Sequence, residues 1–283
     1  MSNSILITSA SGNIGTQLVQ QLSADGINVI AGSSSGKSVN GVPTRHVDFA
    51  DEKSLASAFA GIDTLFLLLP LVPEKLQLAR NAVAAAKAAG VKHIVRSSGA
   101  GADPQAGFAL PRLQGEIDQL IIDSGIPFTL IRPATFMQNF ATYFSGMIKT
   151  GALYLPQADG RVSFIDVRDI AAVTAAVLKN PAAHAGQMYT LTGGAAVSNA
   201  AAISLIAQAT GKAISYVAVD DKSAIESMKS MGMDDWSIEQ MMSLHQLTAA
   251  GYAAGTTDTV QNILGRAPIT FASFVQDHRQ SWL

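Results

Sequence analysis

A glycine-containing stretch near the start of the chain is the first place where residue types and spacing predict chemistry. Residues 4–22 read SILITSASGNIGTQLVQQL, in which an apolar stretch leads into Gly12 and Gly15 and a helical pattern follows. The amide groups that open a helix have no partner within it and lie at the positive end of its dipole, so such a turn suits a pyrophosphate. We therefore expect a dinucleotide to bind here.

The individual residues of this turn have different expected roles. Gly12 would let the backbone approach the phosphates, and Gly15 would let the helix pack closely on the strand. Ser11 or Asn13 could cap the helix or donate to a phosphate oxygen. Ser9 stands where the spacing G-x-x-G-x-x-G would place its first glycine. A positive φ at this serine would cost about 1–3 kcal/mol, whereas a negative φ would cost nothing and leave its hydroxyl as a further donor.

The loop after the second strand pattern bears on the choice of cofactor. Sites that prefer NAD place an acidic side chain there, on the ribose 2′-hydroxyl. This chain reads AGSSSGK at 31–37, without an acidic residue. Ser33, Ser34 and Ser35 can donate to a 2′-phosphate, and Lys37 can neutralise it. We predict a preference for NADP(H), with NAD(H) also able to bind; the alternative is a solvated loop with Lys37 free in water.

The sequence carries no established pair of catalytic residues. Dehydrogenases with such a turn often use a tyrosine and a lysine four positions later, but none of the five tyrosines is followed in this way, and Leu110 and Gln114 stand where the pair is expected. Nucleophile turns, GKS-type phosphate loops and zinc motifs are missing too, so no metal is expected. Ser98 and Gln114 remain as catalytic candidates, although the SSGAG turn at 97–101 could equally satisfy its own backbone.

Composition narrows the class of protein further. The 283 residues include no cysteine, which excludes disulfides and thiolate sites and leads us to expect a cytoplasmic protein. The net charge is −2 and the basic residues are scattered, so nucleic acid is not an expected ligand. The longest apolar run, 64–72, is too short to span a membrane. Charged residues make up only 14% of the chain, which suits buried subunit contacts and makes a homodimer plausible.

Strand-like and helix-like patterns alternate along much of the chain. Apolar runs such as ILIT, INVIA and DTLFLLL alternate with helical runs such as EKLQLARNAVAAAKAAG. Continuously apolar strands indicate burial on both faces, which predicts an α/β fold with a Rossmann-type, doubly wound parallel sheet. We assign residues 1–134 to a dinucleotide-binding domain whose sheet is completed by segments within 160–193. Residues 135–159 and 194–283 are assigned to a smaller, mainly helical, substrate-side domain.

Some local patterns are specific enough to predict element boundaries. Gly26, Gly90 and Gly125 each follow a helical run and precede an apolar one, which is typical of the positive-φ residue that ends a helix. The run SFIDVRDIAAVTAAVLKN at 163–180 predicts a strand that leads into a helix, and GQMYTLTG predicts the last strand. Residues 195–283 predict helices joined by short connections.

Several runs together resemble the NmrA-like group of atypical short-chain dehydrogenase-related proteins. These are TSASGNIG, AAKAAGVKHIVRSSG, DSGIPFTLIRPATFMQNF and GRVSFIDVRDIAAVTAAVL, and the resemblance covers nearly the whole chain. It implies a Rossmann domain with a smaller C-terminal domain, and NADP(H) more often than NAD(H). Members include an NADPH-dependent quinone oxidoreductase, triphenylmethane and azo dye reductases, and regulators that bind the dinucleotide without turnover. The chain departs from the group at Ser9, and at Ser33, where such reductases often carry an arginine.

The expected site residues form two groups. The positions expected to contact the dinucleotide are Thr8, Ser9, Ser11, Gly12, Asn13, Ile14, Ser33, Ser34, Ser35, Lys37, Asp48, Phe49, Leu69, Pro70, Ser97 and Pro133. The positions expected to contact an acceptor are Phe136, Asn139, Trp236, Met241, His245 and Tyr252. Phe136 and Asn139 are carried over from the group's RP..FM.N segment, in which Arg132 could equally form a structural ion pair. Asp48 could instead begin a turn, and His245 could instead face solvent.

The missing tyrosine favours acceptors that need little help from an acid. Quinones and delocalised cationic dyes take a hydride into a conjugated system, so positioning and exclusion of water supply most of the rate. Our leading hypothesis is an NADPH-dependent reductase of a small quinone-like or dye-like acceptor. A sensor that binds the dinucleotide and signals to a protein partner is the second hypothesis. An isomerase or epimerase of a nucleotide sugar is the third, and the absent Tyr-x-x-x-Lys pair argues against it.

Overall fold

The fold is built on a seven-stranded sheet, seen in a computed structural model that describes residues 4–283. Its strand order is β3-β2-β1-β4-β5-β6-β9, and the pairs from β3 to β6 are parallel. The strands are β1 (Ile5–Ile7), β2 (Val29–Ser33), β3 (Thr44–His46), β4 (Thr64–Leu67), β5 (His93–Ser97), β6 (Phe128–Pro133) and β9 (Gln187–Leu191). Every residue of β1, β4 and β5 is buried, as expected for a parallel sheet that is covered on both faces. The predicted Rossmann-type sheet is therefore confirmed.

The chain forms two compact units. Unit 1 contains the chain up to Gly107, together with Pro111–Pro133 and Ile170–Thr190. Unit 2 contains Phe108–Leu110, Ala134–Asp169 and Leu191–Leu283. Unit 1 therefore holds nearly all of the central sheet, although its last strand comes from a late part of the chain. The functional roles that we assigned to the two parts stay a prediction.

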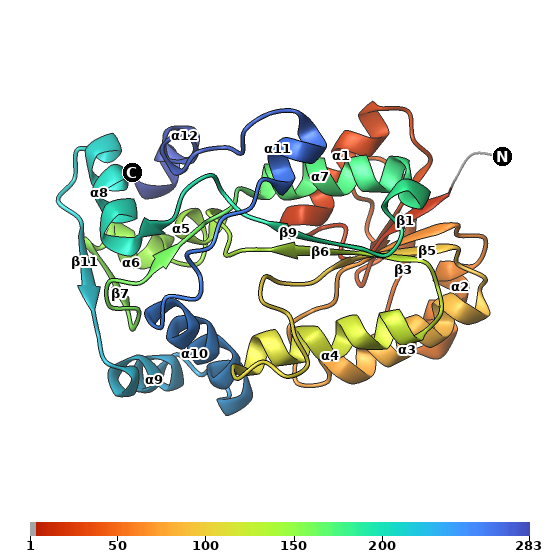
Figure 1. The fold of residues 1–283 in the computed structure, drawn as a ribbon, viewed down its shortest axis with the longest axis horizontal. Helices are drawn as coiled ribbons and strands as arrows, with labels where there is room; N and C mark the ends of the chain where they lie inside the picture. Colours follow the sequence, from red (N-terminus) through yellow and green to blue (C-terminus); the bar gives the residue numbers. More distant parts are fainter. Residues whose placement is uncertain (1–3) are drawn as a thin grey trace. The chain divides into compact units, whose positions relative to one another are not determined.

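Helices cover both faces of the sheet in unit 1. They are α1 (Asn13–Ala24), α2 (Glu52–Phe59), α3 (Lys75–Ala88), α4 (Ala109–Asp123), α7 (Val167–Lys179) and the 3-10 turn η1 (Pro181–His184). Helices α2, α3 and α4 lie along one face and α1 and α7 along the other (Figure 1). On the first face, Leu65 and Ile94 of the sheet pack with Ala82 of α3 and Ile117 of α4. The small side chains of α3 recur every three or four residues, which brings this helix close to the strands.

Unit 2 is mainly helical but also contains four short strands. Its helical elements are α5 (Gln138–Ala141), α6 (Ser145–Lys149), α8 (Asn199–Thr210), α9 (Asp221–Ser230), α10 (Asp235–Ala249), α11 (Thr259–Leu264), α12 (Phe271–Asp277) and η2 (Arg279–Trp282). Its strands are β7 (Ala152–Leu155), β8 (Arg161–Val162), β10 (Val197–Ser198) and β11 (Ser215–Ala218). Strand β8 pairs antiparallel with β10, and β7 pairs parallel with β11.

An aromatic cluster forms the core of unit 2. The rings of Phe140, Phe164 and Phe271 contact one another, and Trp282 is fully buried beside them. The indole nitrogen of Trp282 donates a 2.8 Å hydrogen bond to the backbone oxygen of Phe140, so its one polar atom is satisfied. This contact ties the end of the chain to the core of unit 2.

Two local expectations for these segments were wrong. Residues 195–283 do not form helices alone, because β10 and β11 pair with strands of residues 152–162. The predicted strand before α7 is reduced to a single bridge between Phe136 and Ile165. The polar residues at the two ends of this segment form hydrogen bonds outside the sheet. Ser163 donates to the backbone oxygens of Ala253 and Gly255. The Asp166 carboxylate accepts from the amide of Arg168. By contrast, Gly26, Gly90 and Gly125 all have positive φ at helix ends, as predicted.

No helix of residues 4–283 is both long and apolar enough to cross a membrane. Within the same residues, no group of three or more His, Asp or Glu side chains is placed to hold a metal ion.

Candidate functional site

Helix α1 closes tightly onto the end of β1. A Cβ atom at Gly15 would lie 2.3 Å from the backbone oxygen of Ser9 and 2.6 Å from the Cα of Ala10. At Gly12 a Cβ would lie 3.3 Å from the Ser9 oxygen, which is tight but not prohibitive. Only glycine therefore fits at position 15, and its role in close helix-to-strand packing follows from this geometry.

Ser9 has the positive φ of the glycine that it replaces. Its φ is +51°, in the left-handed region that costs energy for residues with a side chain. The Ser9 hydroxyl donates a 2.9 Å hydrogen bond to the backbone oxygen of Leu68. Next to it, the hydroxyl oxygen of Thr8 accepts a 2.9 Å hydrogen bond from the amide of Leu68. The two side chains thus join the turn to the segment after β4, and the bonds offset the strain at Ser9.

The start of α1 is left open for a ligand. Gly12 is the N-cap residue, and among the described residues no side chain caps the helix; the first turn itself carries no acidic residue. Ser11, Gly12 and Asn13 are exposed, whereas Ile14 is buried against the sheet. Uncapped first-turn amides at the positive end of a 12-residue helix are suited to bind a pyrophosphate. A dinucleotide therefore fits the residues present at this turn.

The loop after β2 presents hydroxyls and one cation. The Ser33 side chain is buried, and its hydroxyl forms a 2.9 Å hydrogen bond with that of Ser35. Ser34, Ser35 and Lys37 are exposed, and Gly36 turns the chain with a φ of +64°. Ser33 therefore orients Ser35, while Ser34, Ser35 and Lys37 remain accessible to a phosphate.

Asp48 and Phe49 follow β3, and each accepts a hydrogen bond from another residue of unit 1. The Asp48 carboxylate accepts a 2.9 Å hydrogen bond from the amide of Ala50, so it begins a turn. Asp51, not Asp48, caps helix α2. Phe49 is buried, and its backbone oxygen accepts from the side chain of Asn81. Contact of either residue with the dinucleotide stays a prediction.

The remaining expected contacts lie where β4, β5 and β6 end. Leu69 is buried and Pro70 is exposed in the segment after β4. Ser97 is buried at the end of β5. Pro133 ends β6, and its backbone oxygen accepts a 2.9 Å hydrogen bond from the amide of Ala100. Carboxyl ends of parallel strands meet at one edge of a sheet, so all four residues share an edge with the turn before α1.

A buried carboxylate lies at the centre of the residues that follow β5. Asp118 of α4 accepts 2.9 Å hydrogen bonds from the Ser98 hydroxyl and from Nε of Arg132. A guanidinium nitrogen of Arg96 contacts the other carboxylate oxygen, and this pair is almost fully buried. Arg96 also donates to the backbone and side-chain oxygens of Gln114. Arg132 is therefore in an ion pair, and Ser98 and Gln114 are both held by charged partners.

Sequence reasoning missed two of these charged residues, Arg96 and Asp118. Arg96 follows Ile94 and Val95 directly in the predicted strand KHIVRSS, and Asp118 lies three residues before Ile121 in the helical run EIDQLIID, at a spacing that shares one helix face. A charged residue within a buried strand or on the buried face of a helix is rare unless it is paired. That departure from the apolar pattern was the available signal.

Lys75, the first residue of α3, was missed as well. Its side chain is only 5% exposed, and in the part of the chain that the structure describes it forms no salt bridge. Burial, and then the positive charge of nearby Arg96, lower the pKa of Lys75 to about 7. A lysine in such surroundings exchanges its proton near neutral pH.

Comparison with known proteins identifies the family. The sequence pattern of the NmrA-like family matches residues 1–260. The chain belongs to the NmrA-like family. The NAD(P)H azoreductase of Xenophilus azovorans is 36% identical over 279 residues, which cover 97% of each chain.

Solved structures confirm the fold of this NmrA-like protein. The NADPH-dependent quinone oxidoreductase of Escherichia coli, complexed with NADPH, matches with a TM-score of 0.86 and 26% identity, over 96% of this chain and 99% of that chain. A protein from Staphylococcus aureus described as a nucleoside-diphosphate-sugar epimerase matches with a TM-score of 0.87 and 26% identity, over 98% and 100% of the two chains. The predicted family and the Rossmann-type fold are both confirmed.

The two positions carried over from the NmrA-like segment lie in unit 2. Phe136 is half-buried and bridges Ile165, while Asn139 is half-buried and accepts at its backbone oxygen from the amide of Phe144. Within residues 4–283, neither side chain forms a hydrogen bond that would exclude an acceptor. Their contact with an acceptor stays a prediction.

The four other expected acceptor contacts differ widely in exposure. Trp236 and Met241 are half-buried, and Met241 packs on an apolar cluster of α9 and α10. Tyr252 is 73% exposed, and its ring forms a T-shaped contact with that of Phe108. His245 is only 3% exposed and does not face solvent, because its Nδ1 bonds the side chain of Gln157 at 2.8 Å. Burial lowers the pKa of His245 to about 4, so this histidine is neutral near pH 7.

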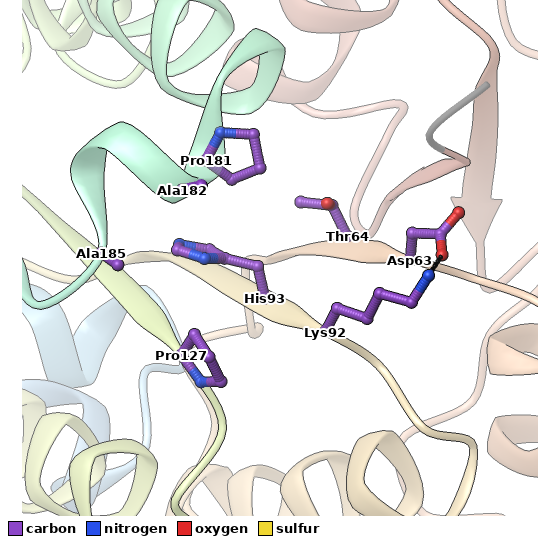
Figure 2. A pocket seen from close by; sticks show the side chains of 8 residues that line it. All are labelled: Asp63, Thr64, Lys92, His93, Pro127, Pro181, Ala182 and Ala185. Atoms are coloured by element: carbon purple, nitrogen blue, oxygen red, sulfur yellow. Dashed lines mark ion pairs between the residues drawn. The ribbon is translucent and has the colours of Figure 1, made fainter. Parts of the chain in front are cut away.

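A separate cavity of about 460 Å³ lies in unit 1 (Figure 2). It is lined by Asp63, Thr64, Lys92, His93, Pro127, Pro181, Ala182 and Ala185. Strands β4 and β5 begin at Thr64 and His93, so the cavity lies at the amino ends of the strands, opposite the turn before α1. Ligands of such sheets bind at the carboxyl ends. We therefore do not assign this cavity to the dinucleotide.

His93 in that cavity has a structural role in unit 1. The Thr129 hydroxyl donates to the backbone oxygen of His184, so it can only accept from Nε2 of His93 at 2.9 Å. This arrangement fixes the proton of the imidazole on Nε2. Burial lowers the pKa of His93 to about 4.

Proposed function

We propose that this protein is an NAD(P)H-dependent reductase of quinone-like or conjugated dye-like acceptors. The observation that carries the proposal is the uncapped start of α1, which Gly15 allows to close on the end of β1. The azoreductase that is 36% identical over almost the full length uses NAD(P)H, according to its name. The similar quinone oxidoreductase from Escherichia coli was solved with NADPH. Both relatives support reduction of a conjugated acceptor.

Different residues of unit 1 would bind different parts of the dinucleotide. The first-turn amides of α1 would take the pyrophosphate. The exposed Ser35 and Lys37 would take a 2′-phosphate, which is why we propose NADP(H) over NAD(H). When bound, the reduced nicotinamide supplies a hydride. The protein itself contributes orientation and exclusion of water.

Reduction fits the side chains better than removal of an alcohol proton. The position expected for a catalytic lysine holds Gln114, whose side-chain oxygen accepts from the guanidinium of Arg96. Leu110 stands where the tyrosine would be. Neither residue can act as the base that an epimerase or alcohol dehydrogenase needs. The likeness to the Staphylococcus aureus protein described as an epimerase therefore supports the fold and not that activity.

We further propose that six residues contact the acceptor, one of them, His245, from a buried position. The others are Phe136, Asn139, Trp236, Met241 and Tyr252. The absence of cysteine supports a cytoplasmic location. The low share of charged residues supports a homodimer, which light scattering on the purified protein tests.

Oxidation of NADPH by the purified protein tests the proposed function. The acceptors are a panel of quinones, azo dyes and triarylmethane dyes, with NADH and a protein-free blank measured in parallel. Saturable turnover that prefers NADPH is the expected result. Tight binding of NADPH without turnover of any acceptor would instead indicate a sensor that signals to a protein partner. Absence of NADPH binding would reject both.

A further inference from the structure

Lys75 is a buried cation that the proposed function has not used. It begins α3 directly after the segment that follows β4, so it lies at the edge of the sheet where β5 ends. That segment is joined to the turn before α1 through the bonds from Leu68 to Thr8 and Ser9. Lys75 therefore belongs to the same end of the sheet as the candidate dinucleotide site.

The charges grouped around Arg96, which lies beside Lys75, do not balance. Arg96 and Arg132 share a single carboxylate, that of Asp118. The Nε atom of Arg96 is buried without a hydrogen-bond partner among the described residues. Lys75 adds a third cation beside Arg96 and has no carboxylate of its own in residues 4–283. A cluster with three cations and one carboxylate favours either a negative charge on a bound molecule or loss of a proton from its lysine.

Only the lysine in this cluster can give up a proton. Arginine stays charged in proteins, whereas a desolvated lysine is readily deprotonated. The charged groups that face Lys75 are Arg96 of β5 and, through Arg96, Asp118 of α4 and Arg132 of β6. Glu74, the neighbouring residue in the chain, is exposed. The charge that acts on Lys75 is therefore that of a cation, Arg96, which favours release of the proton.

We propose that Lys75 donates the proton that accompanies hydride transfer to an uncharged acceptor. The proposal rests on the proposed function and names a proton source for the same site. It assigns the role that a tyrosine has in related dehydrogenases to a lysine on a different helix.

The reaction balances with water as the only additional reactant. An uncharged quinone or azo compound gains two electrons with a hydride, and the reduced nicotinamide is oxidised. An N–H bond of the Lys75 ammonium breaks, and a bond from the proton to an oxygen or nitrogen of the acceptor forms. Lys75 is left neutral and takes a proton from water. A hydroquinone or a hydrazo compound is the product.

Cationic triarylmethane dyes provide an internal comparison, because a hydride alone converts them to neutral products. Lys75→Met replaces the buried ammonium by an apolar side chain of similar length, which a buried site tolerates. We expect this variant to lose about a hundredfold or more of its rate on quinones and azo dyes. We expect its rate on triarylmethane dyes and its Kd for NADPH to change less than about threefold. Lys87→Met, on the exposed face of the same helix, is the matched control and should match wild type on all acceptors.

Two further readouts separate proton donation from a structural role. With a quinone, the wild-type rate should fall as pH rises above 7, and the low rate of Lys75→Met should lose this dependence. In cofactor-free protein labelled with ¹³C at lysine Cε, one resonance should titrate near pH 7 and vanish in Lys75→Met but not in Lys87→Met. A structural role would lower the rate on every acceptor equally.

The proposal fails if Lys75→Met reduces quinones at the wild-type rate, or if no lysine titrates below pH 9. In either case turnover by the wild type would leave the proposed reductase function intact. If the wild type binds NADPH but reduces no acceptor, both proposals fail together.

Discussion

The Ser9 hydroxyl donates a hydrogen bond of 2.9 Å to the backbone oxygen of Leu68. This bond joins the turn before α1 to the segment after β4, and it is made by a residue with a φ of +51°. A glycine at this position would relieve the strain but could not form the bond. Serine at position 9 therefore has a strained backbone conformation but forms a hydrogen bond between two segments of the candidate site.

Substitution of Ser9 should separate these two contributions. Ser9→Gly removes the strain and the hydrogen bond together, so the free energy of unfolding should change by less than about 1 kcal/mol. Ser9→Ala keeps the positive φ and loses the bond, and should destabilise the protein by about 1–2 kcal/mol. Urea denaturation measures the free energy of unfolding of both variants. Equal stability of the alanine and glycine variants would contradict the strain at Ser9.

Gly15→Ala should disrupt the candidate dinucleotide site. The added Cβ would lie 2.3 Å from the Ser9 oxygen, so α1 must move away from β1. We expect a loss of about 1–3 kcal/mol in stability and at least a tenfold higher Kd for NADPH, because the first-turn amides are displaced. Gly107→Ala is the matched control, since a Cβ there meets no atom within 4 Å. Tight NADPH binding by Gly15→Ala, measured by fluorescence, would reject the site.

Lys37→Ala should weaken binding of NADPH but not of NADH. Lys37 is exposed beside Ser35, where a charge-assisted bond to a 2′-phosphate is worth about 1.5–3 kcal/mol. The Kd for NADPH should therefore rise about ten- to a hundredfold. Calorimetric titration with each dinucleotide gives the two constants, and Lys53→Ala, an exposed lysine on α2, serves as the control. A parallel loss of NADH binding would show that Lys37 does not read the 2′-phosphate.

Asp118→Asn should destabilise the protein far more than Asp63→Asn. In the part of the chain that the structure describes, Asp118 is the one carboxylate that pairs with buried Arg96, so its loss leaves a charge unpaired and should cost about 3–5 kcal/mol. Asp63 pairs with exposed Lys92 at 2.6 Å, and loss of such a surface pair should cost less than about 1 kcal/mol. Denaturant unfolding of both variants at one pH makes the comparison. Similar losses would contradict the burial of the Asp118 cluster.

Mild acid should reduce stability through His93 and His245. The fold lowers the pKa of each to about 4 from an ordinary value of 6.5, so the unfolded chain binds protons more readily between these values. The stability that the two neutral imidazoles contribute is complete above pH 6.5 and is lost as pH falls toward 4. Between pH 8 and pH 5, the free energy of unfolding should therefore fall by about 2 kcal/mol less in His93→Gln than in wild type. An unchanged loss, measured by urea unfolding at the two pH values, would count against a neutral buried His93.

The sequence alone predicted the features that depend on neighbouring residues. Alternating apolar runs predicted the parallel sheet because buried strands must be apolar on both faces. Gly12 and Gly15 predicted the turn before α1 because its requirements fall within a few residues of chain. The family was also recognisable, since its characteristic runs extend over most of the sequence. The four short strands of unit 2 were not predicted, because two- to four-residue strands carry too little pattern.

The tertiary structure decided which charged groups share a buried environment. Lys75, Arg96, Asp118 and Arg132 come from α3, β5, α4 and β6, and nothing in the local sequence indicates that they meet. The strength of an ion pair and the pKa of a lysine depend on burial and on distance to other charges, which only the packing of those elements sets. The hydrogen bond between Ser9 and Leu68, some sixty residues away, was likewise decided by the tertiary structure. The sequence thus predicted a dinucleotide site at the turn before α1, and only the packing of these elements decided that Lys75 is buried beside Arg96, which favours loss of its proton.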